Sequence, residues 1–360
     1  MLKKVMSLVL VVAMLFSFTG CQSEDQAVNE ENEKGQVEEV KEVSTIVDSK
    51  GREIEIPENK DKLVALNGNV YDILSILGLE DNIIAVNDSM AESIPGAKDK
   101  VAVGDWKTPS AEKILELEPD VVFGYTKYTE EEFIKQLEKA GITVVLLDFY
   151  NCAELIKETE ILGKFFDKED EAKEFTGFIS GNLQLIKDRT KDIKEEDKVN
   201  VYFEGYSDYA TAGPGSGGHE LVLAANCINI AGEEDTAYPK ISDEWVLERN
   251  PEIVVKNVSN RKGLTGPGVT DESKVKPIYD SIVGRTGWEN IEAVKNNKVI
   301  IMDSSISMAP QGSVIGALYI AKLAYPEEFK DIDPNAINKE MQEKFFNQSE
   351  DGIFVYPAVN

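Results

Sequence analysis

A gap-free internal repeat is the feature that most constrains how this chain of 360 residues folds. Residues 110–123 align with residues 242–255. Each copy has a serine, a glutamate two residues later, an apolar pair, a proline followed by an acid, and a β-forming run. Serine is a good helix N-cap, and a first-turn acid complements the helix dipole. Each copy therefore predicts a capped helix, a proline stop and a parallel strand, and the repeat predicts two related lobes.

Short apolar runs alternate with amphipathic segments in both halves of the chain. This alternation is typical of βαβ units, which form a mostly parallel sheet covered by helices. We expect an α/β protein with two such lobes, joined by a long rigid helical connector. The predicted strands are 62–66, 83–86, 121–124, 144–148, 199–204, 253–256 and 299–303, and the predicted helices are 70–77, 111–117, 130–140, 220–228, 243–249 and 314–324.

The predicted connector lies between the halves. Residues 152–196 contain no proline, and their apolar residues recur at helical spacing. Gly177 and Gly181 argue against one unbroken helix. The resulting division is a signal peptide (1–20), a lipidated cysteine with a disordered acidic tether (21–44), an N-terminal lobe (45–151), the connector (152–197) and a C-terminal lobe (198–360).

The N-terminal residues predict export and membrane attachment. Lys3 and Lys4 precede an apolar run, 5–18, that is too short to span a bilayer. The run ends in Gly20-Cys21, which resembles a bacterial lipoprotein cleavage box in which Cys21 carries acyl chains such as palmitate. An ordinary signal peptide that happens to contain a cysteine is the alternative. We expect a protein anchored by lipid to the extracytoplasmic face of the cell membrane.

Composition excludes several classes of function. The net charge of -28 argues against nucleic acid as a partner. The single histidine, His219, leaves too few imidazoles for capture of bare zinc, and no Gly-x-Ser-x-Gly nucleophile elbow is present. Cys152 and Cys227 lie in no metal-binding pattern, so we expect two free thiols, with a disulfide as the alternative. We expect no enzyme, no catalytic residues, no cofactor and no metal site.

Four further segments, in this order and spacing, resemble a known family. They are 46–57, 63–79, 213–231 and 287–303. With the repeat and the cleavage box, they are similar to the substrate-binding lipoproteins of ABC importers for iron-siderophores, haem and cobalamin, the class with a helical backbone between its lobes. The resemblance covers about residues 45–330. It implies a monomer that captures a metal chelate or corrinoid between two lobes and delivers it to an ABC permease and its ATPase.

The resemblance also implies a docking role for two repeat positions. In this family one glutamate on each lobe pairs with permease arginines, and the matching residues are Glu112 and Glu244. The alternative is that both are only first-turn helix acids.

The ligand crevice is predicted beyond the carboxyl ends of the strands. Trp106 is the strongest candidate, since aromatic rings suit a large planar or chelated ligand, and a half-buried core tryptophan is the alternative. His219 is either an axial metal ligand or a capping residue, and the loop 213–219 is either an anion cradle or a permissive turn. The predicted ligand-binding residues are Asn67, Asn69, Tyr71, Trp106, Lys107, Tyr125, Tyr209, Ser216, His219 and Arg261. The predicted crevice also includes Asp88, Ser89, Asp105, Tyr128, Phe149, Tyr150, Tyr206, 213–219, 256–261 and 308–311.

Three functions fit a two-lobed chain of this kind. A transport receptor is favoured by the cleavage box together with the repeat. A surface sensor or adhesin on the same fold is the alternative. An enzyme of nitrogenase-like shape is disfavoured, because such a protein needs cluster cysteines or catalytic histidines.

Overall fold

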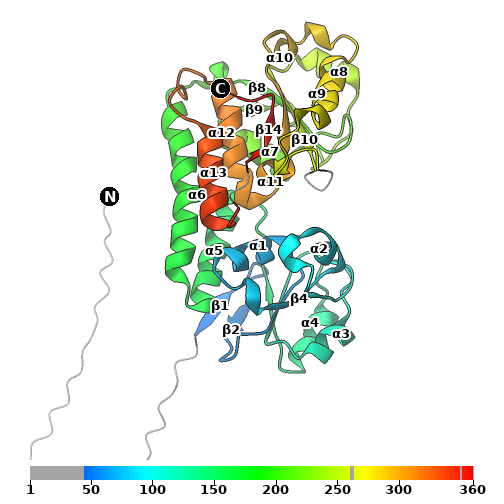
Figure 1. Cartoon of the computed structure of the whole chain (residues 1–360), viewed down its shortest axis with the longest axis vertical. Helices are drawn as coiled ribbons and strands as arrows, with labels where there is room; N and C mark the ends of the chain where they lie inside the picture. Colours follow the sequence, from blue (N-terminus) through cyan, green and yellow to red (C-terminus); the bar gives the residue numbers. More distant parts are fainter. Residues whose placement is uncertain (1–43, 260–262, 349–350, 360) are drawn as a thin grey trace, which may run out of the picture. The chain divides into compact units, whose positions relative to one another are not determined.

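Two five-stranded sheets form the centres of two lobes in the computed structural model (Figure 1). The structure describes residues 44–259, 263–348 and 351–359. Cys21, the predicted signal peptide and most of the tether lie outside the described residues, as does Arg261. Within the described part of the chain, every helix is too short or too polar to cross a bilayer.

The first sheet is entirely parallel, in the order β5-β4-β3-β6-β7. Its three central strands are almost fully buried, which is expected of a parallel sheet covered on both faces. The antiparallel pair β1 (Thr45–Val47) and β2 (Glu53–Glu55) precedes it. The sheet contains β3 (Leu63–Ala65), β4 (Ile83–Val86), β5 (Val101–Ala102), β6 (Val121–Gly124) and β7 (Thr143–Leu146), and the helices of this lobe are α1 (Gly68–Ile76), α2 (Asp88–Ser93), α3 (Ala111–Leu117) and α4 (Glu131–Glu138).

The second sheet has the order β14-β12-β10-β8-β9, and only its edge strand β14 runs antiparallel. Its strands are β8 (Asn200–Glu204), β9 (Ile228–Asn229), β10 (Ile253–Val258), β12 (Val299–Asp303) and β14 (Val355–Tyr356), and a short pair joins β11 (Gly266–Pro267) to β13 (Gly352–Ile353). The helices of this lobe are α7 (Gly217–Ala224), α8 (Asp243–Arg249), α9 (Lys276–Val283), α10 (Glu292–Lys295), α11 (Ser304–Ser307), α12 (Ser313–Ala324) and α13 (Pro334–Phe345).

The repeat is confirmed in three dimensions. Ser110 caps α3 by accepting from the Lys113 amide, and Ser242 caps α8 by accepting from the Trp245 amide. Both helices end at a residue with positive φ, 47° at Glu118 and 43° at Asn250, directly before the proline. The two copies therefore build the same helix–strand unit in each lobe.

One predicted helix is wrong at its end. The prediction was a helix over 220–228, but α7 stops at Ala224 and Ile228 begins strand β9. Asn226 takes a φ of 56°, a left-handed conformation that a helix interior excludes. The chain therefore turns at Asn226 and enters the sheet beside β8.

The connector is built from α5 (Cys152–Phe166) and α6 (Glu169–Thr190). The helix breaks at Asp167, which has a φ of 56°, and not at the two glycines. Gly177 and Gly181 lie inside α6, each with open space on its Cα. Helix α6 packs against α5 and α12, and Phe175 and Phe178 both make ring contacts with Phe345 of α13. A continuous helix of 22 residues thus packs on the other connector helix and on two helices of the second lobe.

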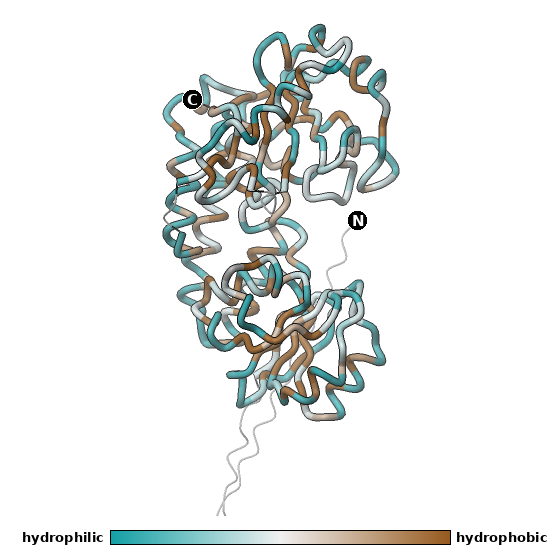
Figure 2. The backbone as a smooth tube through the Cα atoms, turned by 45° about the vertical axis from the view of Figure 1, so that its right-hand side comes forward, coloured by the Kyte–Doolittle hydropathy of each residue, from teal (hydrophilic) through white to brown (hydrophobic). Residues whose placement is uncertain are grey.

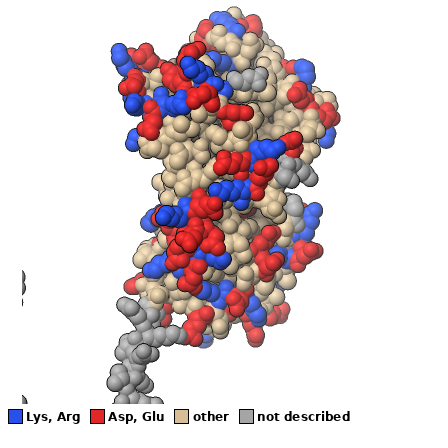
Figure 3. Space-filling model, turned by 60° about the vertical axis from the view of Figure 1, so that its left-hand side comes forward, with Lys and Arg blue, Asp and Glu red and all other residues tan. Residues whose placement is uncertain are grey.

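Hydrophobic residues, brown along the backbone in Figure 2, concentrate on the strands at the centre of each lobe. On the face in Figure 3, acidic and basic side chains are interspersed, so the negative net charge is not gathered into one acidic patch there.

Candidate ligand-binding site

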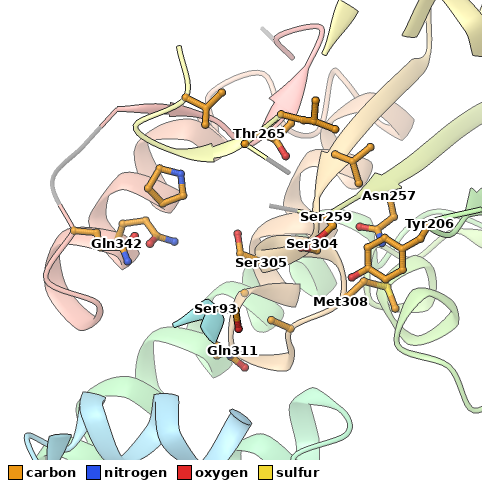
Figure 4. Close-up of a pocket in the computed structure, with 18 of the residues that line it drawn as sticks. Ser93, Tyr206, Asn257, Ser259, Thr265, Ser304, Ser305, Met308, Gln311 and Gln342 are labelled. Carbon is orange, nitrogen blue, oxygen red and sulfur yellow. The ribbon is translucent and has the colours of Figure 1, made fainter. Parts of the chain in front are cut away.

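A cavity of about 1430 Å³ lies against the carboxyl ends of β8, β10 and β12. Asp72, Ser93 and Ile94 line it from the first lobe, and residues of the second lobe form the rest of the wall. Tyr206, Asn257 and Met308 lie together on one side of it, and Gln342 of α13 lies on the other (Figure 4). The crevice therefore forms where parallel strands end, as expected for open α/β sheets.

Neutral polar groups make up much of the wall. The Asn257 side chain is fully buried and accepts a hydrogen bond of 2.6 Å from Ser307 Oγ. Its Nδ2 has no hydrogen-bond partner among the described residues, and neither does Gln311 Oε1. Buried polar groups are normally paired, so these two atoms are a donor and an acceptor available to a ligand or to water.

A cluster of four charged residues stands beside Tyr206. Glu204 is buried and accepts two hydrogen bonds from Arg285, at 2.7 and 2.9 Å, and one from Lys256 Nζ at 2.9 Å. Burial by itself raises the pKa of the Glu204 carboxyl, but the bonds from Arg285 and the charge of Lys256 outweigh it and lower this pKa. Asp208, which is mostly exposed, lies 3.2 Å from Arg285 and 3.5 Å from Lys256.

One hydrogen bond crosses the cavity wall from lobe to lobe. Gln311 Nε2 donates to Asp72 Oδ2, which joins the segment before α12 to helix α1. Burial raises the pKa of Asp72 from 3.8 to about 7; the nearby charge of Glu80 adds to the rise, and the bond from Gln311 opposes it. Asp72 therefore exchanges its proton near neutral pH while facing the cavity.

The comparisons with known proteins agree on one family. The sequence profile described as periplasmic binding protein matches residues 63–306. The molybdate-binding protein MolA of Haemophilus influenzae is 24% identical over 337 residues, which cover 84% of this chain and 91% of MolA. The molybdate-bound structure of MolA aligns with a TM-score of 0.69 at 23% identity and covers 86% of this chain and 99% of MolA.

Two relatives from Bacillus subtilis strain 168 match over similar lengths. The uncharacterized ABC transporter substrate-binding lipoprotein YvrC is 27% identical, covering 80% of this chain and 87% of YvrC. The petrobactin-binding protein YclQ is 26% identical, covering 82% of this chain and 89% of YclQ.

This chain belongs to the periplasmic binding protein family. The membership confirms the resemblance inferred from the sequence, and the two sheets with their helices confirm the predicted fold class.

The predicted aromatic residues of this periplasmic binding protein gather at the carboxyl ends of the first sheet. The Trp106 ring lies edge-on to Tyr125 and Tyr128, with ring centroids 5.8 and 4.8 Å away, and Lys107 Nζ stands 4.8 Å from the Trp106 ring. Burial raises the pKa of Tyr125 to about 12, and the Asp72 charge contributes to this rise. None of these residues lines the cavity, so their ligand role stays a prediction.

Three other predicted residues form hydrogen bonds with backbone groups of nearby loops and helices. Asn67 caps α1 and donates to the Leu147 carbonyl, and Asn69 donates to the Asp148 carbonyl. Ser216 caps α7, the helix that the loop 213–219 feeds. These contacts explain the local folding of the loops, and the ligand roles of the three side chains stay predictions.

Three more predicted residues, Tyr71, His219 and Tyr209, contact other protein groups outside the cavity wall. Tyr71 is buried and donates to Glu80. His219 Nδ1 lies 3.0 Å from Asn229 Nδ2. The Tyr209 hydroxyl donates to Asp243, and its ring supports Arg285. None of these three lines the cavity, and their ligand roles stay predictions.

Glu112 and Glu244 occupy equivalent first-turn positions of α3 and α8. Both are exposed, and within the described part of the chain neither carboxylate has a hydrogen bond or an ion pair. The described residues also hold no group of three or more His, Cys, Asp or Glu side chains that could bind a metal ion. Cys152 and Cys227 are both free thiols.

The sequence predicted part of the cavity wall, namely Tyr206, 256–259, Met308, Ala309 and Gln311. The predicted first-lobe crevice residues Asp88, Ser89, Tyr128, Phe149 and Tyr150 do not line it. The prediction missed Asp72 and the contributions of α11 and α13, which include Ser304, Ser305 and Gln342. Asp72 offered a signal: it is an acid within the otherwise largely apolar helix α1. No local sequence signal placed helix α13 at the cavity, because its position depends on how the chain folds back after α12.

Proposed function

We propose that this protein is a lipid-anchored, extracytoplasmic receptor that captures a metal chelate in the cavity and delivers it to an ABC permease and its ATPase. The chelate is a ferric siderophore, haem or a corrinoid. The cavity carries the proposal: at about 1430 Å³ it exceeds the roughly 300–1,000 Å³ of ordinary small-molecule pockets. The role requires binding and release, and no chemical conversion of the ligand.

Size separates a chelate from a bare ion. MolA is named for molybdate, a small oxyanion that would fill little of this cavity. YclQ is named for petrobactin, a much larger molecule. The absence of a metal-binding cluster from the described residues favours a metal that arrives with its own organic ligand.

Two features support delivery to a membrane permease. The exposed carboxylates of Glu112 and Glu244 stand at matching places on the two lobes, where each can receive a bidentate pair from an arginine. Cys21 follows the apolar run in the pattern of a lipoprotein, and the relative YvrC is named as a lipoprotein of an ABC transporter.

Ligand titration tests the central claim. Tryptophan fluorescence would be followed while a ferric tris-catecholate, a ferric tris-hydroxamate, haem, cyanocobalamin, molybdate and zinc are added in turn. We expect at least one chelate to bind with a Kd below about 1 μM, which is about 8 kcal/mol of binding free energy. Tight binding of molybdate or zinc alone would refute the chelate proposal.

Charge reversal tests docking. Glu112→Arg with Glu244→Arg should abolish uptake in cells and leave the Kd of the chelate unchanged. The matched control is Glu116→Arg with Glu248→Arg, which changes the same helices one turn later at positions that are also exposed. Equal loss of uptake in both double mutants would contradict a specific docking role.

Cell fractionation tests the anchor. Replacing Cys21 with alanine should release the protein from the membrane fraction, since the acyl chains would have no attachment site. A mutant that stays as firmly bound as the parent would contradict lipidation.

A further inference from the structure

We propose that Lys256 forms an anion subsite of the cavity, that Arg285, which contacts Asp208 but does not itself line the cavity, adds its positive charge from behind, and that Asp208 is a built-in carboxylate which a negatively charged ligand displaces. The inference rests on the proposed receptor function and narrows its ligand to an anionic chelate, one that presents carboxylate, catecholate or similar oxygens. Three observations carry it: the two weakly used donors of Lys256, the fixed position of Arg285 and the exposure of Asp208.

The ammonium of Lys256 is buried but incompletely paired. Its side chain is 5% exposed, and an ammonium group has three N–H donors. One reaches Glu204 at 2.9 Å, while the contacts with the Tyr206 carbonyl and Asp208 are both 3.5 Å, the outer limit of a hydrogen bond. Lys256, Tyr206 and Asp208 all line the cavity, so the weakly used donors face the space that a ligand would occupy.

The guanidinium of Arg285 is fixed in place. Its carbon lies 4.4 Å from the Tyr209 ring centroid and 4.6 Å from that of Trp288. Two of its nitrogens bind the two oxygens of Glu204, and one of these also lies 3.2 Å from Asp208. A cation held by two rings and a bidentate carboxylate has little freedom left to lose when a ligand binds.

Of the two carboxylates that contact Lys256 and Arg285, Asp208 is the one that a ligand can replace. The two cations share one buried acid, Glu204, whose side chain is 1% exposed, so a positive charge remains for a second anion. Asp208 supplies that anion with a side chain that is 71% exposed. Because Asp208 is already mostly hydrated, its release into water costs little, whereas the release of Glu204 would strand two buried cations.

Two substitutions and a matched control test the subsite. Asp208→Asn removes the competing charge with little change of shape, and Lys256→Gln removes one cation. Asp235→Asn is the control, since Asp235 is an exposed acid of the same lobe that does not line the cavity. The probes are a negatively charged ferric tris-catecholate and an uncharged ferric tris-hydroxamate, both titrated by tryptophan fluorescence.

We expect Asp208→Asn to tighten tris-catecholate binding by about fivefold to tenfold, the effect of one charge a few ångströms away in a partly hydrated site. Lys256→Gln should weaken it by more than about tenfold, and tris-hydroxamate affinity should stay within about twofold in all variants. Asp208→Asn decides the test if Lys256→Gln fails to fold, because Asp208 is exposed.

The outcomes separate this inference from the proposed function. Tris-catecholate affinity that is unchanged or weakened by Asp208→Asn would overturn the subsite. Binding of only uncharged chelates by the parent protein would overturn the subsite and leave the receptor function standing. Failure to bind any chelate of the panel would overturn both.

Discussion

Replacement of Asp72 by asparagine should stabilise the protein at neutral pH and change how its stability depends on pH. The carboxyl of Asp72 faces the cavity, accepts from Gln311 and has no basic partner among the described residues. Burial raises its pKa from 3.8 to about 7, because the charged form is poorly solvated. An amide at position 72 carries no charge, and its N–H can donate to Gln311 Oε1, which now lacks a partner.

The sign follows from proton binding. Between about pH 4 and pH 7 the folded protein keeps a proton on Asp72 that the unfolded chain has already released, so stability from this group falls as the pH rises. It is fully present below the ordinary pKa of 3.8 and lost above about 7. The pKa of Asp72 rises by about three units on folding. At about 1.36 kcal/mol per unit, this rise corresponds to about 4 kcal/mol of folding free energy that is lost between low and neutral pH.

Urea unfolding followed by tryptophan fluorescence measures this difference. We expect Asp72→Asn to match the parent within about 1 kcal/mol near pH 4 and to exceed it by about 4 kcal/mol above pH 7. Asp99→Asn, at an exposed position of the same lobe, is the control for the loss of one negative charge from a strongly acidic protein. A gain that is independent of pH, or a loss of stability at pH 7.5, would refute the reasoning.

Three further outcomes are expected. Glu204→Gln should lower the free energy of unfolding by about 3–5 kcal/mol, measured in urea, because Lys256 and Arg285 would lose their buried counter-ion; a change below about 1 kcal/mol would contradict this. Trp106→Ala should weaken chelate binding by at least about tenfold in a titration, since a large aromatic contact is removed, and unchanged affinity would assign Trp106 to a structural role. Small-angle scattering should detect little change in the radius of gyration on ligand binding, because the continuous helix α6 packs on α5 and on α12 of the second lobe, and α5 contacts β1 of the first lobe; a large decrease would contradict a stiff connector.

The fold was predictable where one local signal sufficed. The strands 83–86, 121–124 and 299–303 and the helices 111–117 and 243–249 have the predicted bounds, since each has a cap, a proline or a clear apolar run at its ends. The elements not predicted include the helices α9 and α13 and several very short strands. The two-residue strands β5, β9 and β14 exist only because a neighbouring strand offers free hydrogen-bonding groups, which the local sequence does not reveal.

The site was less predictable because its residues are neutral and dispersed. The prediction favoured aromatic and polar side chains near strand ends, and two of them, Tyr71 and Asn67, instead hydrogen-bond to neighbouring groups of the protein. The wall also uses Ser305 and Gln342, which the prediction did not include, beside Asn257 and Gln311, which lie in the predicted ranges 256–261 and 308–311. Asn257 and Gln311 are distinguished by burial and by one polar atom without a partner among the described residues, and both features depend on tertiary structure.

The C-terminal part of the chain supplies one side of the cavity wall. The family profile ends at residue 306, yet nine of the lining residues lie beyond it, in the loop before α12 and around the end of α13. Met341, Gln342 and Phe346 close the side opposite Tyr206, so one wall is apolar and amide-bearing while the other carries the Lys256 cluster. A ligand that fits both walls has an extended apolar or amide surface and an anionic end. This combination suits an organic chelate better than a bare oxyanion, in line with the ligand class that we propose.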